Sequence, residues 1–218
     1  MKLGKVVKSN SHCDYLVQVS DRFEVTEPPS PDRYGFGSFV RLDPPEGNGF
    51  RERSLNSSRP TAVGIVYNSQ LFNPQFLNTG PRLTSEADPL FTPDLIEETR
   101  TLLSVVLIGE LLGESNSNAT ANLPYGNQGI PRAIVPINAD VYTMNELEIR
   151  QFHRDPIGAS QFRYHSILLR YGGNFATHLT EQILQELVGL NIFKNAEQRA
   201  LSTLCREMSW RNTLGSLT

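Results

Sequence analysis

Three neighbouring residues near the start of the chain have side chains of the types that do nucleophilic chemistry. His12, Cys13 and Asp14 supply a nucleophile, a base and a carboxylate. Neighbouring residues of an extended strand point to opposite faces, so an adjacent His and Cys cannot meet as a catalytic dyad. The sequence therefore predicts a buried Cys13 beside an exposed His12, and no catalytic residue at this position.

Paired carboxylates and scattered histidines are the next candidates for chemistry. Glu97–Glu98 is typical of the charged end of a short helix, and the pair Glu146 and Glu148 opens a predicted helix in which Glu146 has a capping role. General acid–base catalysis would require such carboxylates to face each other in a cleft. A zinc site needs about four closely spaced N or S ligands. That spacing is missing among His153, His165, His178 and Cys205, so we predict no metal site.

Glycine pairs at residues 35–37 and 47–49 invite comparison with a phosphate-binding loop. Neither pair is followed by Gly-Lys-Ser/Thr, so no backbone cradle with a phosphate-binding lysine is predicted. We interpret both pairs as loop hinges, and we expect the chain to need no cofactor and to hydrolyse no nucleotide by itself. An unrecognised enzyme with a cleft between its two halves is the least favoured hypothesis.

Basic and aromatic side chains remain as candidate interaction residues. Arg51, Arg53 and Arg59 flank a charged, glycine-containing loop, with Arg33, Arg41 and Arg82 elsewhere in the first half. Such a cluster is usually a solvated surface, while contact with an acidic partner or nucleic acid is the minority interpretation. Trp210 either anchors the last helix or, if exposed, marks an interface hot spot.

Composition limits the class of protein. The 218 residues are 39% hydrophobic and 20% charged, as in soluble globular proteins, and the net charge of −3 argues against a surface given over to nucleic acid. The longest apolar run, residues 101–113, contains Glu110 and is shorter than the roughly 20 residues that span a bilayer. No apolar signal core follows the N-terminal lysines. We therefore expect a soluble, cytoplasmic protein.

The two cysteines leave two alternatives open. Cys13 and Cys205 are far apart in sequence. They are compatible with a disulfide, but two buried thiols in a reducing compartment are the commoner arrangement.

The elements of the first half are organised around residues 101–113. Val105, Val106 and Ile108 are β-branched, which favours a fully buried strand. Before it, the patterns predict a hairpin over 3–8 and 13–19, strands at 37–42 and 61–67, loops at 43–59 and 72–93, and a short helix at 94–98. Several short strands separated by turns are typical of a small β-barrel.

The second half is predicted to be helical after a linker. Residues 114–129 have a loop composition, and residues 129–141 contain two prolines and predict an extended crossing segment. Thr143-x-x-Glu146 has the pattern of a capping box for a helix ending near 152 or 153. Apolar spacing predicts helices over 164–171, 175–187 and 195–208, packed as a bundle. The predicted fold is α+β, with a β-barrel domain at 1–113, a linker and crossing segment at 114–142, and an α-helical bundle at 143–218.

Short motifs in the predicted strands resemble one known family. The opening Leu3-Gly4-Lys5-Val6-Val7, the Gly37-Ser38-Phe39-Val40 strand and the Thr61-Ala62-Val63-Gly64-Ile65-Val66 strand are similar to the "Gly-x-Val", "Gly-x-Phe/Tyr-Val" and "Val-x-Gly-x-Val" strands of the HAS-barrel. Residues 141–148 also resemble a stretch that follows such barrels. The family includes HerA-type DNA translocases and catalytic-type subunits of rotary ATP synthases.

The resemblance implies an assembly role rather than catalysis. In that family the barrel precedes a P-loop ATPase domain and contributes to a ring collar or to docking of a partner such as a nuclease. Here helices follow instead, and the ATPase residues are missing, so the chain resembles the stand-alone barrel proteins of cyanobacteria. We expect a non-catalytic adaptor that binds an ATPase or nuclease assembly, or itself. The alternative is a nucleic-acid-associated module that uses the basic loops of the barrel.

Overall fold

The computed structural model describes residues 1–22, 24–43, 60–72, 100–113, 124–193 and 195–215. Apart from residues at their ends, the loops predicted at 43–59 and 72–93 lie outside the described residues, as does the helix predicted at 94–98. The strands are β1 (Lys2–Ser9), β2 (Asp14–Val19), β3 (Phe39–Asp43), β4 (Thr61–Phe72), β5 (Arg100–Leu112), β6 (Tyr125–Gln128) and β7 (Asp140–Thr143). The α-helices are α3 (Glu146–Phe152), α4 (His165–Tyr171), α5 (Ala176–Gly189) and α6 (Asn195–Gly215).

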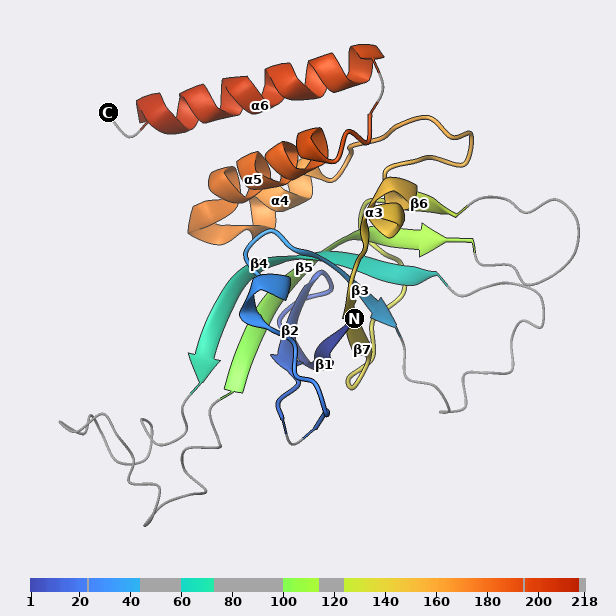
Figure 1. Ribbon diagram of the computed structural model, residues 1–218, viewed down its shortest axis with the longest axis vertical. Coiled ribbons are helices and arrows are strands. Elements are labelled where there is room, and N and C mark those ends of the chain that lie inside the picture. Colours follow the sequence, from blue (N-terminus) through green and yellow to red (C-terminus); the bar gives the residue numbers. More distant parts are fainter. Residues whose placement is uncertain (23, 44–59, 73–99, 114–123, 194, 216–218) are drawn as a thin grey trace, which may run out of the picture.

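Six of the described strands close into an antiparallel barrel below a layer of helices (Figure 1). Their order is β2-β1-β7-β3-β4-β5, and β5 pairs back with β2 to complete the ring. Closure gives each strand of the ring two neighbours, which satisfies backbone donors and acceptors that an open sheet would leave unpaired. The α+β class and the small barrel predicted from the sequence are both confirmed.

The individual strands follow the predicted patterns closely. β1 and β2 form the predicted N-terminal hairpin, with Gly4 opposite Val19 and Ser9 opposite Tyr15. β3 occupies the predicted third position. β4 is longer than predicted, because pairing with β5 continues as far as Phe72. Its last residues are polar or exposed, so the apolar pattern alone could not reveal them.

β5 is the central strand of the molecule, as predicted. Leu103, Val105 and Leu107 belong to the cluster that fills the barrel. Val106 and Ile108 belong to the cluster beneath the helices. Since both faces of β5 are covered, its residues form a nearly continuous apolar run instead of alternating with polar ones.

Two strands lie in the stretch that was predicted to be a linker. β7 pairs with β1 on one side and β3 on the other, and β6 pairs with the end of β5. The barrel therefore uses residues beyond 113, in the stretch that was predicted to be a linker and an extended crossing segment outside the barrel domain. The prediction went wrong because each strand has four residues, too few to show alternation, and because partners distant in sequence supply the hydrogen bonds.

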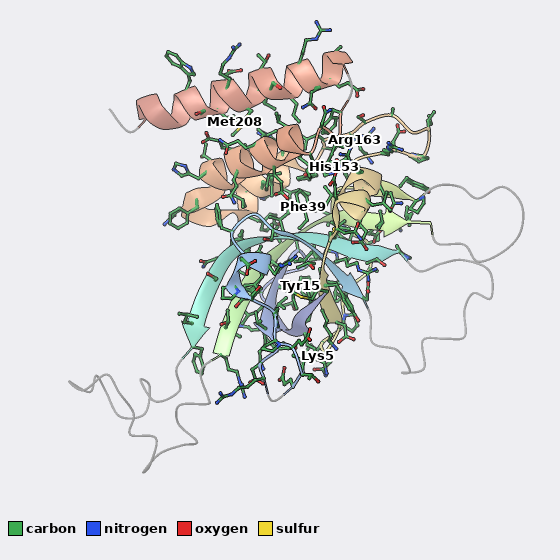
Figure 2. The ribbon with its side chains drawn as sticks, in the orientation of Figure 1. Lys5, Tyr15, Phe39, His153, Arg163 and Met208 are labelled. Carbon is green, nitrogen blue, oxygen red and sulfur yellow. The ribbon has the colours of Figure 1, made fainter. Side chains whose placement is uncertain are left out.

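Side chains fill the barrel. Tyr15 lies inside it (Figure 2), 1% exposed, and its hydroxyl accepts a hydrogen bond from the backbone N–H of Val135 at 3.2 Å. Val135 and Ala139 lie on the segment before β7 and are themselves buried in this core. The interior is completed by Leu3, Val6, Cys13, Val17, Val19, Val40, Leu42, Ala62, Val66, Leu103, Val105, Leu107 and Val141.

The helices share their core with the outer wall of the barrel. In Figure 1, α4 and α5 lie over the barrel and α6 lies over α5. Leu179, Ile183 and Leu187 of α5 are buried in one cluster with Phe39 and Ile65 of the barrel wall. The predicted helices are thus present, but they form layers on the barrel and not a bundle with a separate core. No α-helix within the described residues is long and apolar enough to cross a membrane.

Two local predictions in the helical half were wrong. The capping box lies two residues further on: the Asn145 side chain accepts from the N–H of Glu148, and Glu148 accepts from the N–H of Asn145. Thr143 instead ends β7, because pairing with β3 holds it in the sheet. The helix predicted to begin with apolar Phe175 begins instead at Ala176, and Phe175 is 60% exposed and packs edge-on against Phe36.

Candidate functional site

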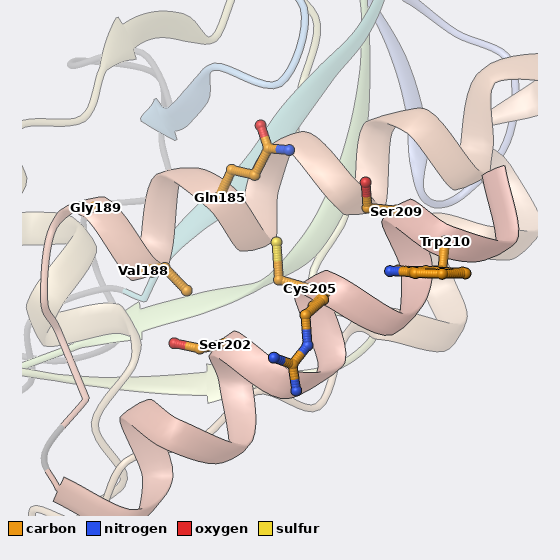
Figure 3. Close-up of a pocket in the computed structure, with 8 residues that line it drawn as sticks. Gln185, Val188, Gly189, Ser202, Cys205, Ser209 and Trp210 are labelled. Carbon is orange, nitrogen blue, oxygen red and sulfur yellow. The ribbon is translucent and has the colours of Figure 1, made fainter. Parts of the chain in front are cut away.

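A groove lies between α5 and α6 in the helical layer (Figure 3). Its volume is about 480 Å³. The carboxyl-terminal half of α5 forms one wall, and the middle of α6, residues 202–210, forms the other. The lining residues are Gln185, Val188, Gly189, Ser202, Cys205, Arg206, Ser209 and Trp210.

Small residues create this groove. Gly189 has no side chain, and no atom lies within 4 Å of the position a Cβ would take. Ser202 and Ser209 are small and lie two helical turns apart on α6. Gln198 fixes α6 against α5, because its Nε2 donates a hydrogen bond to the carbonyl of Val188 at 3.0 Å. The two helices are therefore held together while their side chains leave the groove open.

A tryptophan and an arginine lie together at the groove. Trp210 is 64% exposed, and Arg206 is one helical turn before it. Among the residues described, Arg206 makes no ion pair. Because most of the Trp210 side chain is exposed, Trp210 does not anchor the last helix. Buried Met208 and Leu201 anchor α6 instead.

The thiol in the groove is suited to packing and not to attack on a substrate. Burial raises the pKa of Cys205, and the nearby charge of Glu181 raises it further. Burial also raises the pKa of Cys13. Both cysteines are free. A raised thiol pKa lowers the thiolate fraction at neutral pH, so neither sulfur is activated as a nucleophile.

His12 and Cys13 are arranged as predicted, one exposed and one buried. The His12 ring lies against the crossing segment, with Nε2 2.7 Å from the carbonyl oxygen of Pro131. Cys13 is 2% exposed and belongs to the barrel core. The two side chains thus have separate structural roles. In the described part of the chain, no group of three His, Cys, Asp or Glu residues could hold a metal ion.

His153 is the most unusual titratable group in the structure. It is 0% exposed, between the barrel and the helices (Figure 2). Its Nδ1 lies 2.7 Å from the carbonyl of Ile149, and its Nε2 lies 2.8 Å from the Tyr164 hydroxyl. Because a carbonyl can only accept, Nδ1–H donates and Nε2 accepts from Tyr164. The rings of Phe39, Phe152, Tyr164 and Phe193 surround it.

This environment makes His153 a structural residue. Desolvation lowers its pKa to about 4, outweighing the hydrogen bond to Ile149, which acts to raise it. Burial also raises the pKa of Tyr164 well above its usual value. Both groups therefore stay neutral at pH 7 and satisfy each other in an apolar core. Sequence reasoning considered His153 as one of four side chains without the spacing of zinc ligands, and its ring neighbours in the structure are aromatic.

Three of the remaining predicted site residues lie in the described part of the chain and have charged partners there. Arg41 lies 3.5 Å from Glu148 and its guanidinium is 4.9 Å from the centre of the Tyr142 ring. Glu146 pairs with Arg150 along α3. These carboxylates therefore already have cationic partners. The candidate interaction residues Arg51, Arg53 and Arg59 lie outside the described residues, as do Arg82, Glu97 and Glu98.

Sequence reasoning missed the groove although it singled out Trp210. The signal was the set of small residues at Ser202, Cys205 and Ser209, which follow one another at intervals of three and four positions. Such a stripe also occurs on helices packed closely together, so it does not by itself indicate a groove.

Comparison with known proteins gives a family without an assigned activity. No curated protein matches this sequence. A family model described as a domain of unknown function, DUF8166, matches residues 1–218. The match spans the barrel and the helices together, and the chain therefore belongs to the DUF8166 family.

Proposed function

We propose that this protein is a non-catalytic adaptor that docks onto a larger assembly, such as an ATPase or nuclease complex, through the α5–α6 groove. One observation carries the proposal: Trp210 is 64% exposed beside Arg206 at the edge of an apolar groove. Trp and Arg are the residue types most enriched among interface hot spots. A large aromatic surface left in water is stabilised when a partner covers it.

The groove defines the chemistry of the partner surface. Val188, Cys205 and Trp210 offer apolar contacts, so an aliphatic or aromatic side chain fits between the helices. Arg206 is exposed and lacks an ion pair within the described part of the chain, so a carboxylate on the partner would complement it. The partner surface is therefore expected to combine an apolar side chain with an adjacent Asp or Glu.

The barrel supports this role as a rigid framework. Its interior is filled by side chains and leaves no large lumen among the residues described, which favours a scaffold over a carrier of small molecules. The resemblance of β1, β3 and β4 to HAS-barrel strands adds the expectation of a P-loop ATPase or nuclease partner, because barrels of that family serve assembly. In this chain the last barrel strand is followed by helices.

Affinity purification from the native cells tests the proposal. Tagged wild-type protein is captured at low salt and the bound proteins are identified by mass spectrometry. Trp210→Ala is compared with a matched control, Ile157→Ala, which removes an apolar side chain that is 92% exposed outside the groove. We expect a stoichiometric partner with a P-loop ATPase or nuclease domain, retained by Ile157→Ala and lost by Trp210→Ala.

Two results would contradict the adaptor role. One is a partner that binds both variants equally, since the groove would then not be the docking surface. The other is substrate turnover by the purified protein that is abolished by changing one side chain. Circular dichroism spectra of both variants exclude misfolding as the cause of lost binding.

A further inference from the structure

The rim of the α5–α6 groove on the α6 side carries a row of exposed side chains. Arg206 and Trp210 line the groove, and Arg199 extends their row by two turns toward the start of α6. The three residues follow one another at intervals of seven and four. At 3.6 residues per turn, these intervals keep them within about 40° of one direction around the helix. α6 therefore presents a basic and aromatic row, all of it exposed.

The basic groups of this row have no carboxylate partner in the described part of the chain. The ion pairs found there have Lys2, Arg33, Arg41, Arg100 and Arg150 as cations. Arg199 and Arg206 belong to none of these pairs. On α5, Glu181 accepts a hydrogen bond from Gln185 at 3.3 Å, so the opposite wall is polar to acidic. The two rims thus differ in charge, and carboxylates of another molecule complement the α6 side.

The floor between the rims is small and partly apolar. Ser202, Cys205 and Ser209 occupy positions i, i+3 and i+7 of α6, and Val188 and Gly189 close the α5 side (Figure 3). A volume of about 480 Å³ holds a few side chains and not a whole helix. An occupant therefore stays outside the two helices and inserts one row of its side chains.

The spacing of the two arginines selects the secondary structure of that occupant. Seven residues of α-helix rise by about 10.5 Å, which is the separation of Arg199 and Arg206 along α6. A second helix lying along α6 has residues at i and i+7 on one face with the same separation. An extended strand covers that distance in about three residues, and residues three apart point to opposite faces. Two carboxylates on one face of a helix therefore match the arginines, and two on a strand do not.

We propose that the groove binds an acidic amphipathic α-helix of the partner, which lies along α6 and pairs carboxylates at i and i+7 with Arg199 and Arg206. This inference rests on the proposed adaptor function and specifies the segment of the partner that docks. An apolar side chain at i+3 or i+4 of that helix lies on the same face, level with Ser202 and Cys205, and enters the groove. The next turn beyond i+7 contacts Trp210.

Two synthetic peptides test this arrangement on the full-length protein. Both are alanine-rich, equal in composition and about 18 residues long, so that they can form a helix. In the first, two Glu lie seven residues apart with Leu between them on the same face. In the second, the two Glu lie nine residues apart, on opposite faces. Fluorescence polarisation should show that the first peptide binds at least about threefold more tightly, because the second loses one ion pair.

Variants of the row identify the residues that bind the carboxylates. Arg199→Gln and Arg206→Gln should each weaken binding of the first peptide about threefold. The double variant Arg199→Glu/Arg206→Glu should weaken it at least about tenfold and should instead bind a peptide with Lys in place of both Glu. The control, Arg132→Gln, removes an exposed charge from the segment before β7 and should leave the affinity within about twofold of the wild type.

Three outcomes would overturn the acidic helix. They are no binding of either peptide, equal affinity for both peptides, and unchanged affinity in the two single arginine variants. Failure of the adaptor role is a separate result, because that role is tested at Trp210 with the partner from native cells. A partner that needs Trp210 but binds Arg199→Gln and Arg206→Gln as tightly as the wild type would support the adaptor role and refute the acidic helix.

Discussion

His153 links the helices to the barrel through a single neutral ring. Its two nitrogens bind Ile149 and Tyr164, and four aromatic rings surround it. Protonation would remove the acceptor that Tyr164 needs and would place a charge in an apolar core. The unfolded chain takes up this proton near pH 6.5, whereas the folded protein resists it down to about pH 4. Folding stability therefore depends on pH at this residue.

We predict that the free energy of unfolding is highest above pH 6.5 and falls as the pH drops toward 4. The folded pKa lies below the unfolded one, so the unfolded state binds more protons in this window. The contribution of His153 amounts to about 3 kcal/mol across it. Urea unfolding at several pH values measures the slope.

An exposed histidine provides the contrast. His178→Gln serves as the control variant when the pH slope is measured, because His178 lies on the exposed face of α5. His153→Gln should flatten it and lower stability at pH 7, because glutamine cannot reproduce the ring contacts. An unchanged slope in His153→Gln would show that other groups cause the acid sensitivity.

The start of α3 shows how far a local motif can be predicted. The residues 143–148 read Thr-Met-Asn-Glu-Leu-Glu and contain two overlapping capping patterns, Thr143 with Glu146 and Asn145 with Glu148. Local preference does not separate them, since Thr and Asn both cap helices. The hydrogen bonds of β7 determine which of the two patterns caps the helix, because Thr143 pairs with Val40 and is kept out of the helix. A contact distant in sequence therefore sets the boundary.

At α3 we predict that Asn145→Ala lowers the free energy of unfolding by about 1 kcal/mol, the usual contribution of a capping side chain. Thr143→Ala should cost less, since its hydroxyl makes one exposed hydrogen bond, to the carbonyl of Met1. Chemical denaturation of both variants measures the difference. A larger loss for Thr143→Ala would mean that the helix begins where the first pattern indicates.

β6 depends on a close approach that only glycine allows. Gly126 lies against the carbonyl of Phe152 at the end of α3, and a Cβ at Gly126 would be 1.9 Å from that oxygen. Gln161 strengthens the same contact, because its Nε2 donates to the carbonyl of Gly126 at 2.6 Å. The strand and the helix are therefore joined backbone to backbone.

We predict that Gly126→Ala destabilises the protein by about 2 kcal/mol or more, through displacement of β6 from α3. Gly35→Ala serves as the control, since a Cβ there meets no atom within 4 Å. Thermal unfolding followed by circular dichroism compares the two. Equal melting temperatures for the two variants would contradict the close packing of β6 on α3.

At the scale of the whole molecule, the long patterned elements could be predicted and the short ones could not. The β-branched run of β5 indicated a buried strand, and the apolar spacing of Leu179, Ile183 and Leu187 indicated a helix. β7 has only four residues and follows a proline-containing segment, so its place between β1 and β3 depends on pairing with Leu42 and Gly4. The prediction of separate barrel, linker and bundle segments therefore did not include β7 among the strands that close the barrel.

The candidate site, too, could be predicted from the sequence only in part. Trp210 could be singled out from its residue type alone, because exposing the large apolar surface of a tryptophan to water is unfavourable in free energy. The groove beside it depends on the spacing between two helices, and Gly189 and Ser202 contribute by being small. Nothing in a single sequence distinguishes small residues that allow close packing from small residues that leave a space.

The adaptor role of the α5–α6 groove is tested most directly by the affinity of the purified partner for three proteins. Calorimetric titration gives the dissociation constant for the wild type, for Trp210→Ala and for Ile157→Ala. Loss of a hot-spot tryptophan should weaken binding at least about thirtyfold, whereas Ile157→Ala should stay within about twofold of the wild type. Equal affinities for Trp210→Ala and the wild type would contradict docking through this groove.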